Sequence, residues 1–66
     1  MLRILRYLKG YVFFVAKGGF AERFVNLCRL RGIFIWNAKN DGVNVSAFTN
    51  RSELELLREA AEQSGM

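Results

Sequence analysis

The stretch ERFVNLCRLRGIFIWN, residues 22–37, combines the pattern of a helix with that of a strand. Just before and within its first part, apolar side chains recur at the spacing of one helical stripe, namely Phe20, Phe24, Leu27 and Cys28. Gly32 then suits the left-handed position just past a helix end. The β-branched and aromatic residues that follow are typical of a strand. We therefore predict a helix over residues 20–31 and a strand over residues 33–38.

Two more strands and a second helix flank this unit. Residues 11–17 are apolar at both alternating sets of positions, as in a strand that is buried on both faces. The sequence NDG at residues 40–42 is a turn signal, because Asn, Asp and Gly tolerate positive φ, and it predicts a hairpin into a strand over residues 43–49. A second helix is expected to begin near residues 50–52. Its apolar stripe consists of Leu54, Leu57 and Ala61.

The predicted elements follow one another in the order β-α-β-β-α. A β-α-β crossover is right-handed, which places both helices on one face of an antiparallel sheet and the third strand between the first and the second. The prediction is an α+β fold, a ferredoxin-like split βαββα two-layer sandwich that lacks the final edge strand. Its core is predicted to consist of Phe20, Phe24, Leu27, Cys28, Ile33, Ile35, Val43, Val45, Leu54, Leu57 and Ala61.

The chain is predicted to hold a single small βαββα domain, residues 10–66, preceded by an amphipathic basic segment, residues 1–9, with the sequence MLRILRYLK. The leucines of this segment can share one side of a short helix, with Arg3, Arg6 and Lys9 as their charged counterparts. One interpretation is an interfacial helix whose three cations contact a membrane or another anionic surface. The other is a segment that packs its leucines on the domain or frays at the chain end.

A missing final strand would leave the strand over residues 11–17 with an exposed edge. Long apolar edges pair with other strands, so this edge is a candidate site for a protein partner or for self-assembly. The candidate edge residues are Tyr11, Val12, Phe13, Phe14 and Val15. In the alternative interpretation, residues 1–9 cover the edge.

The sheet face that points away from the helices is predicted to be aromatic. If Ile33 and Ile35 point to the helices, the residues that point away are Phe34, Trp36 and Ala38. The first strand adds either Tyr11 and Phe13 or Phe14 to that face. An exposed aromatic face can stack RNA bases, serve as an assembly surface, or be covered by the N-terminal leucines.

Charge is unevenly distributed along the chain, whose formal net charge is +4 and whose pI is near 9.9. Residues 1–33 hold seven Lys/Arg against Glu22 alone, whereas residues 34–66 hold three Lys/Arg and five Asp/Glu. The first half could therefore face an anionic surface or the acidic half of another copy. A small basic RNA-binding domain that uses the aromatic sheet face is the alternative function. However, the sequence KGYVF at residues 9–13, which partly resembles the RNP1 signature, lies on the first predicted strand rather than the third.

The sequence contains no arrangement of residues typical of catalysis. Histidine, the commonest general base, is absent. Cys28, the single cysteine, falls on the apolar stripe of a helix, where cysteine behaves as a core residue. We therefore predict a protein that is not an enzyme, with no catalytic residue, cofactor or metal site. No apolar run reaches the ~18 residues that span a bilayer, and the cysteine content is typical of a reducing compartment.

The order of elements, together with a set of structural residues, resembles the N-terminal region of the YqfD family of stage IV sporulation proteins of endospore-forming bacteria. The residues that match are Glu22-Arg23-Phe24, Asn26, Cys28, Gly32-Ile33 and Trp36-Asn37. The resemblance extends over residues 9–65. It implies a longer protein, in which a further strand, a membrane-spanning segment and an extracytoplasmic domain follow this region. It implies no enzyme activity and no cofactor.

On this resemblance, the expected function is that of a non-enzymatic sporulation protein needed for endospore formation. This region would be an assembly or interaction module of a membrane protein, on the cytoplasmic side of a membrane in the mother cell. The expected partner is another protein or a second copy of the chain, bound through the edge of the first strand. Membrane association is a further expectation, whereas nucleic acid is not the favoured partner.

Overall fold

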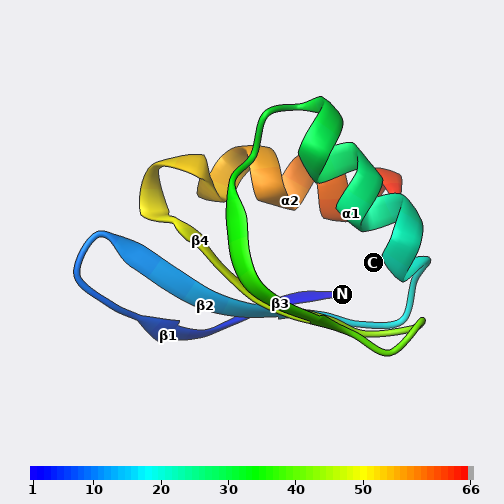
Figure 1. Ribbon diagram of the computed structural model, residues 1–66, viewed down its shortest axis with the longest axis horizontal. Helices are drawn as coiled ribbons and strands as arrows, with labels where there is room; N and C mark the ends of the chain where they lie inside the picture. The colour runs from blue at the N-terminus through cyan, green and yellow to red at the C-terminus, as the bar shows by residue number, and fades with distance from the viewer. Residues whose placement is uncertain (66) are drawn as a thin grey trace.

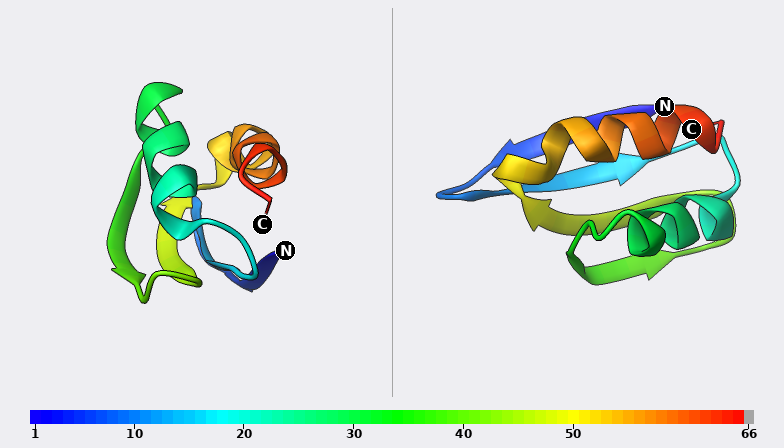
Figure 2. Two further views of the ribbon diagram at one scale, coloured as in Figure 1. Left: turned by 90° about the vertical axis from the view of Figure 1, so that its right-hand side faces the viewer. Right: turned by 90° about the horizontal axis from the view of Figure 1, so that it is seen from above.

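The structure is a computed structural model that describes residues 1–65. Within that range it is an α+β protein in two layers, a four-stranded antiparallel sheet with two α-helices on one of its faces (Figure 1). In chain order the elements are β1 (Leu2–Tyr7), β2 (Tyr11–Ala16), α1 (Ala21–Leu30), β3 (Ile35–Asn40), β4 (Val45–Asn50), the 3-10 helix η1 (Arg51–Glu53) and α2 (Leu54–Gln63). Figure 2 shows α2 over the β1–β2 half of the sheet and α1 over the half that contains β3.

The strands are arranged in the order β1-β2-β4-β3. β4 therefore lies between β2 and β3, as predicted for the three strands that the sequence pattern identified. Both helices lie on one face, which was also predicted. Two strands begin later than predicted, because β3 starts at Ile35 rather than Ile33 and β4 starts at Val45 rather than Val43.

Of the two interpretations of residues 1–9, the interfacial helix is wrong, because this segment forms a strand and a turn that pack on the rest of the domain. β1 pairs antiparallel with β2, with Leu2 opposite Ala16 and Ile4 opposite Phe14. Leu2 and Ile4 pack against the core, and Arg3 between them points to the other face. Leu2-Arg3-Ile4 thus alternates with the period of two that a strand requires. Pairing with β2 outweighs the marginal stability of so short a helix.

The edge predicted to be open, formed by Tyr11, Val12, Phe13, Phe14 and Val15, is not free in this structure. β2 is paired with β1 on one side and with β4 on the other. The alternative in which residues 1–9 cover the edge is therefore the one that the structure shows. The fourth strand of the sheet precedes the βαββα unit in the chain. In the ferredoxin-like plan, the last strand of the chain takes this place.

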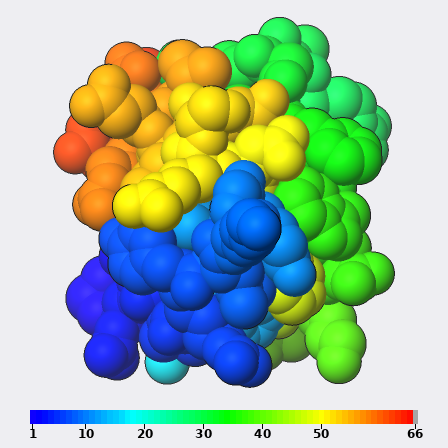
Figure 3. Space-filling model, turned by 90° about the vertical axis from the view of Figure 1, so that its left-hand side faces the viewer, coloured from blue at the N-terminus to red at the C-terminus, as the bar shows by residue number. Residues whose placement is uncertain are grey.

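The turn of the β1–β2 hairpin is attached to the helix layer. The backbone N–H of Arg51 donates a hydrogen bond of 3.1 Å to the carbonyl oxygen of Gly10. The guanidinium carbon of Arg51 lies 5.5 Å from the centre of the Tyr7 ring, which is within the range of a cation–π contact. Figure 3 views this end of the molecule, where the hairpin (blue) lies below η1 and the start of α2 (yellow to orange).

The core lies between the sheet and the helices. Its buried apolar side chains are Val12, Phe14, Ala16, Ala21, Phe24, Cys28, Ile33, Val45, Ala47, Leu57, Ala60 and Ala61. Among the predicted core residues, those confirmed as buried are Phe24, Cys28, Ile33, Val45, Leu57 and Ala61. Three others are partly buried against this cluster, namely Leu27, Ile35 and Leu54. The predicted core lacked the helix-facing side of β2, because both sides of that strand are apolar in the sequence.

Two residues predicted to lie in the core are exposed instead. Phe20 is 68% exposed. It precedes the first turn of α1 with an extended backbone (φ −100°, ψ 97°), so its side chain leaves the helical stripe. Val43 is 55% exposed because it lies in the β3–β4 turn rather than in β4.

The predicted hairpin turn between β3 and β4 is confirmed. The Oδ1 atom of Asp41 accepts the backbone N–H groups of Val43 at 3.0 Å and of Asn44 at 2.6 Å. Gly42 has a φ of 93°, a conformation that glycine adopts without strain. The hydrogen bond from the Asn44 backbone, followed by that from Val43, lowers the pKa of the Asp41 carboxyl group below its usual value of 3.8.

Candidate functional site

The sheet face opposite the helices, which we call the open face, follows from the strand register. Side chains of β2 and β4 alternate between buried and partly exposed along both strands, so every second residue points away from the helices. The pairs across strands place Arg3 opposite Val15, Trp36 opposite Phe48 and Lys39 opposite Ser46. The open face consists of Arg3, Arg6, Tyr11, Phe13, Val15, Trp36, Lys39, Ser46, Phe48 and Asn50.

Five aromatic rings, which we call the aromatic cluster, meet on and beside the open face: Tyr11, Phe13, Phe34, Trp36 and Phe48. The ring centres of Phe13 and Phe48 are 4.9 Å apart, and those of Tyr11 and Trp36 are 5.7 Å apart. The ring centre of Trp36 lies 6.2 Å from that of Phe48 and 5.4 Å from that of Phe34, so Trp36 connects the cluster across β3 and β4. Phe34 is 61% exposed, and the other four rings are partly exposed. The rings therefore form one continuous apolar surface.

The structure settles the side of the sheet on which each predicted aromatic residue lies. Phe34 and Trp36 are outside the core, as predicted. Of the two choices left open for the first strand, Tyr11 and Phe13 lie on the open face, and Phe14 is fully buried. Sequence analysis missed Phe48. Phe48 comes two residues after Ser46, in a strand where Val45 and Ala47 form the apolar side. This alternation was a signal that could have placed Phe48 on the same side as Ser46.

Hydrogen bonds at the start of β3 fix the position of the aromatic cluster. The hydroxyl group of Thr49, which is buried, donates to the carbonyl oxygen of Phe34 at 2.8 Å. The backbone N–H of Phe34 donates to the Oε2 atom of Glu53 at 2.9 Å. Because both polar groups of the Phe34 backbone are held in this way, the chain that leads to Trp36 is fixed against β4 and η1.

Positive charges flank the aromatic cluster on the two outermost strands. Arg3 and Arg6 come from β1, and Lys39 comes from β3. All three side chains belong to exposed residues. Five of the six Asp and Glu side chains belong to α1, η1 and α2. The sixth, Asp41 in the β3–β4 turn, lies at the margin of the open face, where it lines a hollow together with Lys17 and Lys39. The open face is therefore aromatic and carries a net positive charge, with Lys17 as a further cation and Asp41 as the one carboxylate at its margin within the described residues.

The three cations predicted to contact a membrane or an anion are only partly brought together. Arg3 and Arg6 both lie on the open face of β1, on either side of a bulge at Leu5. Lys9 lies in the β1–β2 turn and is exposed at the tip of the hairpin. Lys39 takes the third place on the open face, which the sequence did not predict.

A bulge in β3 creates a shallow hollow on the open face. The register shifts between Trp36 and Lys39, and Asn37 has a positive φ of 52°. This conformation is uncommon except for glycine, and asparagine is one of the residues that tolerate it best. The hollow has a volume of about 380 Å³. It is lined by Phe13, Asn37, Ala38, Lys39, Ser46 and Phe48.

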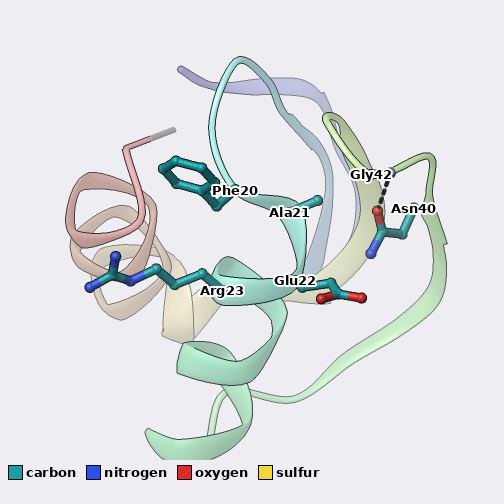
Figure 4. A pocket seen from close by; sticks show the side chains of 6 residues that line it. All are labelled: Phe20, Ala21, Glu22, Arg23, Asn40 and Gly42. Carbon is teal, nitrogen blue, oxygen red and sulfur yellow. Dashed lines mark hydrogen bonds between the residues drawn. The ribbon is translucent and has the colours of Figure 1, made fainter.

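A larger hollow, of about 570 Å³, lies at the start of α1 (Figure 4). It is bordered by residues 20–23 and by the β3–β4 turn, where the Oδ1 atom of Asn40 accepts the N–H of Gly42 at 2.7 Å. The N–H groups at the start of a helix attract anions. Glu22 already places a carboxylate in this first turn, so a second anion would meet its repulsion. We therefore assign no ligand to this hollow.

The structure offers no activated nucleophile at Cys28. The thiol is fully buried in the core, and this burial, with a smaller contribution from the charge of Glu53, raises its pKa to about 11. A thiol with so high a pKa stays protonated near neutral pH and is a poor nucleophile. Among residues 1–65 there is also no group of three or more His, Cys, Asp or Glu side chains placed to hold a metal ion.

Comparison with known proteins identifies the family of the chain. The family model described as "Putative stage IV sporulation protein YqfD" matches residues 6–66, which is nearly the whole chain. No curated protein and no solved structure matches the chain. Within the described range, no helix is both long enough and apolar enough to cross a membrane. The match confirms the resemblance seen in the sequence, and the chain belongs to the YqfD family of sporulation-related proteins.

Proposed function

We propose that this chain is a non-enzymatic docking module of a sporulation membrane protein, and that its open face is the docking surface. The module would act on the cytoplasmic side of a membrane in the mother cell. The observation that supports this proposal best is the aromatic cluster, in which Tyr11, Phe13, Trp36 and Phe48 lie on the side of the sheet that carries no helix and Phe34 lies beside them.

The composition of the open face is that of an interaction surface. A sheet usually buries its apolar face against another layer, and here the helices cover only one face. Trp, Tyr and Arg are the residues most enriched among those that dominate binding energy at interfaces. Trp36, Tyr11 and Arg6 occur together on this face. Contiguous exposed apolar patches on small proteins commonly mark interaction sites.

The sequence predicted docking through the edge of β2, and the surface that we propose in its place is the open face. The backbone groups of β2 are paired with β1 and β4, so a partner strand would have to displace β1. The aromatic side chains on the open face require no such displacement. The assembly role expected from the sequence is thus retained, with a different surface.

The alternative of RNA binding gains no support from the family match, which is to sporulation proteins. The ring geometry does not favour it either. Four of the five neighbouring ring pairs in the cluster are tilted by 31° to 55°, and the fifth, Trp36 with Phe48, is nearly parallel at 15°. The rings as a set therefore do not form one flat platform for successive bases. On β4, one of the two central strands of this face, Phe48 is flanked by Ser46 and Asn50 rather than by further aromatic residues.

The proposal predicts that sporulation depends on the open face. In the host cell, the double variant Trp36→Ala/Phe48→Ala, introduced into the chromosomal gene, should lower the number of heat-resistant spores about tenfold or more, because removal of such anchors weakens binding by at least that factor. The matched control is Phe20→Ala/Leu30→Ala, which removes two exposed apolar side chains from the helix layer. The control should sporulate like the parent strain.

Thermal melts followed by circular dichroism separate loss of docking from loss of folding. The predicted spore counts apply to variants that still unfold cooperatively in these melts. A folded Trp36→Ala/Phe48→Ala variant that yields as many heat-resistant spores as the parent strain would show that the open face is not the docking surface.

A further inference from the structure

We infer that the open face docks on an anionic membrane surface, with the aromatic cluster at the level of the lipid headgroups and the flanking cations on lipid phosphates. This inference rests on the proposed function, because it names the partner of the same surface. The phosphates are those of a lipid bilayer. Binding requires both the aromatic and the cationic residues of the open face.

The aromatic cluster has the chemistry of a membrane–water interface. Trp and Tyr are enriched at that depth, because their rings are apolar while their N–H and O–H groups still reach water. Trp36 and Tyr11 are neighbours, with ring centres 5.7 Å apart. The phenylalanines beside them add apolar rings on the same surface, with Phe13 and Phe48 in contact at 4.9 Å.

The placement of the cations suits a planar anionic surface. Arg3 and Arg6 lie on one outermost strand and Lys39 on the other, with β2 and β4 between them. Long basic side chains can follow an apolar surface with their stems while their charged ends remain in the polar layer. With cations at both margins and rings between them, both kinds of side chain can reach one headgroup layer, whose depth of several Å accommodates rings that are tilted against one another.

Charge argues for a lipid surface rather than the open face of a second copy. Two open faces brought together would oppose Arg3, Arg6 and Lys39 with the same residues. Within the described residues the one carboxylate at the margin of each face is Asp41, which shares its hollow with Lys17 and Lys39, so each face keeps a net positive charge. Like charges in direct opposition are destabilising. Anionic lipids instead attract each nearby Lys or Arg, by roughly fivefold in binding per residue.

The helix layer of a second copy is also a poor match for the open face. The exposed side of α2 carries Glu55, Glu59 and Glu62, interrupted by Arg58. Its one large exposed apolar side chain, within the described range, is Leu56, at 42% exposure. That side could neutralise the cations but could not cover five aromatic rings. The α1 side adds Leu30, and Phe20 just before the helix, but its exposed charges are Arg23 and Arg29 against Glu22 alone, so it would bring further cations to the open face.

The inference is tested by flotation of the full chain with vesicles. One set consists of phosphatidylcholine alone, and in the other about a quarter of the lipid is replaced by phosphatidylglycerol, which supplies the anionic charge. The chain should float with the anionic vesicles and not with the neutral ones. Arg3→Ala/Arg6→Ala/Lys39→Ala should weaken binding roughly a hundredfold if each cation contributes about fivefold.

A charge-matched variant shows whether the open face or the net charge is responsible. Arg23→Ala/Arg29→Ala/Arg58→Ala also removes three exposed cations, but from the helices. It should float nearly as well as the parent chain. Likewise, Trp36→Ala/Phe48→Ala should lose binding and Phe20→Ala/Leu30→Ala should keep it. Equal loss in the two charge variants would mean unspecific attraction and would overturn the inference.

The remaining outcomes distinguish the inference from the proposed function. If the parent chain does not float while the Trp36→Ala/Phe48→Ala strain still fails to sporulate, the lipid partner is wrong and the docking surface stands. If the chain floats through its open face while that strain sporulates normally, the proposed function fails and the lipid contact stands. Tighter binding of a labelled single-stranded RNA than of the anionic vesicles, lost in the same open-face variants, would overturn the inference in favour of RNA.

Discussion

At the scale of single residues, Phe24 and Phe20 show how one spacing leads to two environments. Both fall on the apolar stripe predicted for the first helix. Phe24 is fully buried and meets the edge of the Phe14 ring at a centre distance of 6.0 Å and an angle of 72°. Phe20 lies one residue before the helix begins and is exposed. Periodicity indicates a helix face, but only the position of the first helical turn decides which residues belong to it.

The first residue-scale prediction follows from this difference. Phe24→Ala should reduce the free energy of unfolding by about 3–5 kcal/mol, because it removes a buried ring and leaves a cavity. A domain of this size has only about 3–10 kcal/mol in total, so the variant should lose its cooperative melt or melt far below the parent chain.

Phe20→Ala provides the matched control, measured by chemical or thermal denaturation in the same buffer. It removes the same side chain from an exposed site and should change the free energy of unfolding by no more than about 0.5 kcal/mol. A Phe24→Ala variant that melts near the parent chain would refute the assignment of Phe24 to the core.

At the scale of elements, sequence patterns predicted one helix–strand unit, the turn after it and the second helix. They failed for β1, because Leu2, Leu5 and Leu8 fit a helical spacing while Leu2-Arg3-Ile4 fits a strand. The choice depends on whether a neighbouring strand is available for pairing, which is a tertiary property. The sequence could not show which side of β2 carries Tyr11 and Phe13 for a similar reason. Both sides of that strand are apolar, and only the neighbouring elements decide which side is buried.

The β3–β4 turn supplies the second prediction. The Asp41 carboxylate accepts two backbone N–H groups, and its pKa is lowered mainly by the Asn44 hydrogen bond. Stability contributed by a group with a lowered pKa is fully present above its unfolded value, here 3.8, and is lost as the pH falls below 3.8 through the folded value. Asp41→Asn keeps an acceptor oxygen but cannot titrate.

Melting temperatures measured between about pH 7 and about pH 2 should therefore fall further for the parent chain than for Asp41→Asn. The other carboxylates titrate in both proteins and cancel in the comparison. An equal fall in the two proteins would indicate that the turn hydrogen bonds do not depend on the charge of Asp41.

At the scale of the whole molecule, the fold sorts charge by layer. Five carboxylates lie in the helix layer, whereas the open face holds Arg3, Arg6 and Lys39, with Lys17 and Asp41 at its margin. The sequence analysis detected an excess of positive charge in the first half of the chain, but it could not show that Lys39, from the acidic half, joins the N-terminal arginines. That meeting depends on the strand order, which places β1 and β3 at the two margins of one sheet.

The sequence also indicated an aromatic sheet face but not its extent. Phe34 and Trp36 could be placed from the alternation of the strand around them. Phe48 and the choice of Tyr11 and Phe13 required the register of β2 against β4. The candidate docking surface is thus partly visible in the sequence and complete only in the folded sheet.

The most direct test of the docking surface uses Trp36, the single tryptophan of the chain, which lies within the aromatic cluster. Its fluorescence would be recorded while vesicles with and without phosphatidylglycerol are added to the parent chain. The account predicts that anionic vesicles shift the emission to shorter wavelength and protect the indole from quenching by acrylamide, because the ring leaves water, and that neutral vesicles do neither. If Trp36 emission and quenching stay unchanged with saturating anionic vesicles, the open face does not dock on that surface.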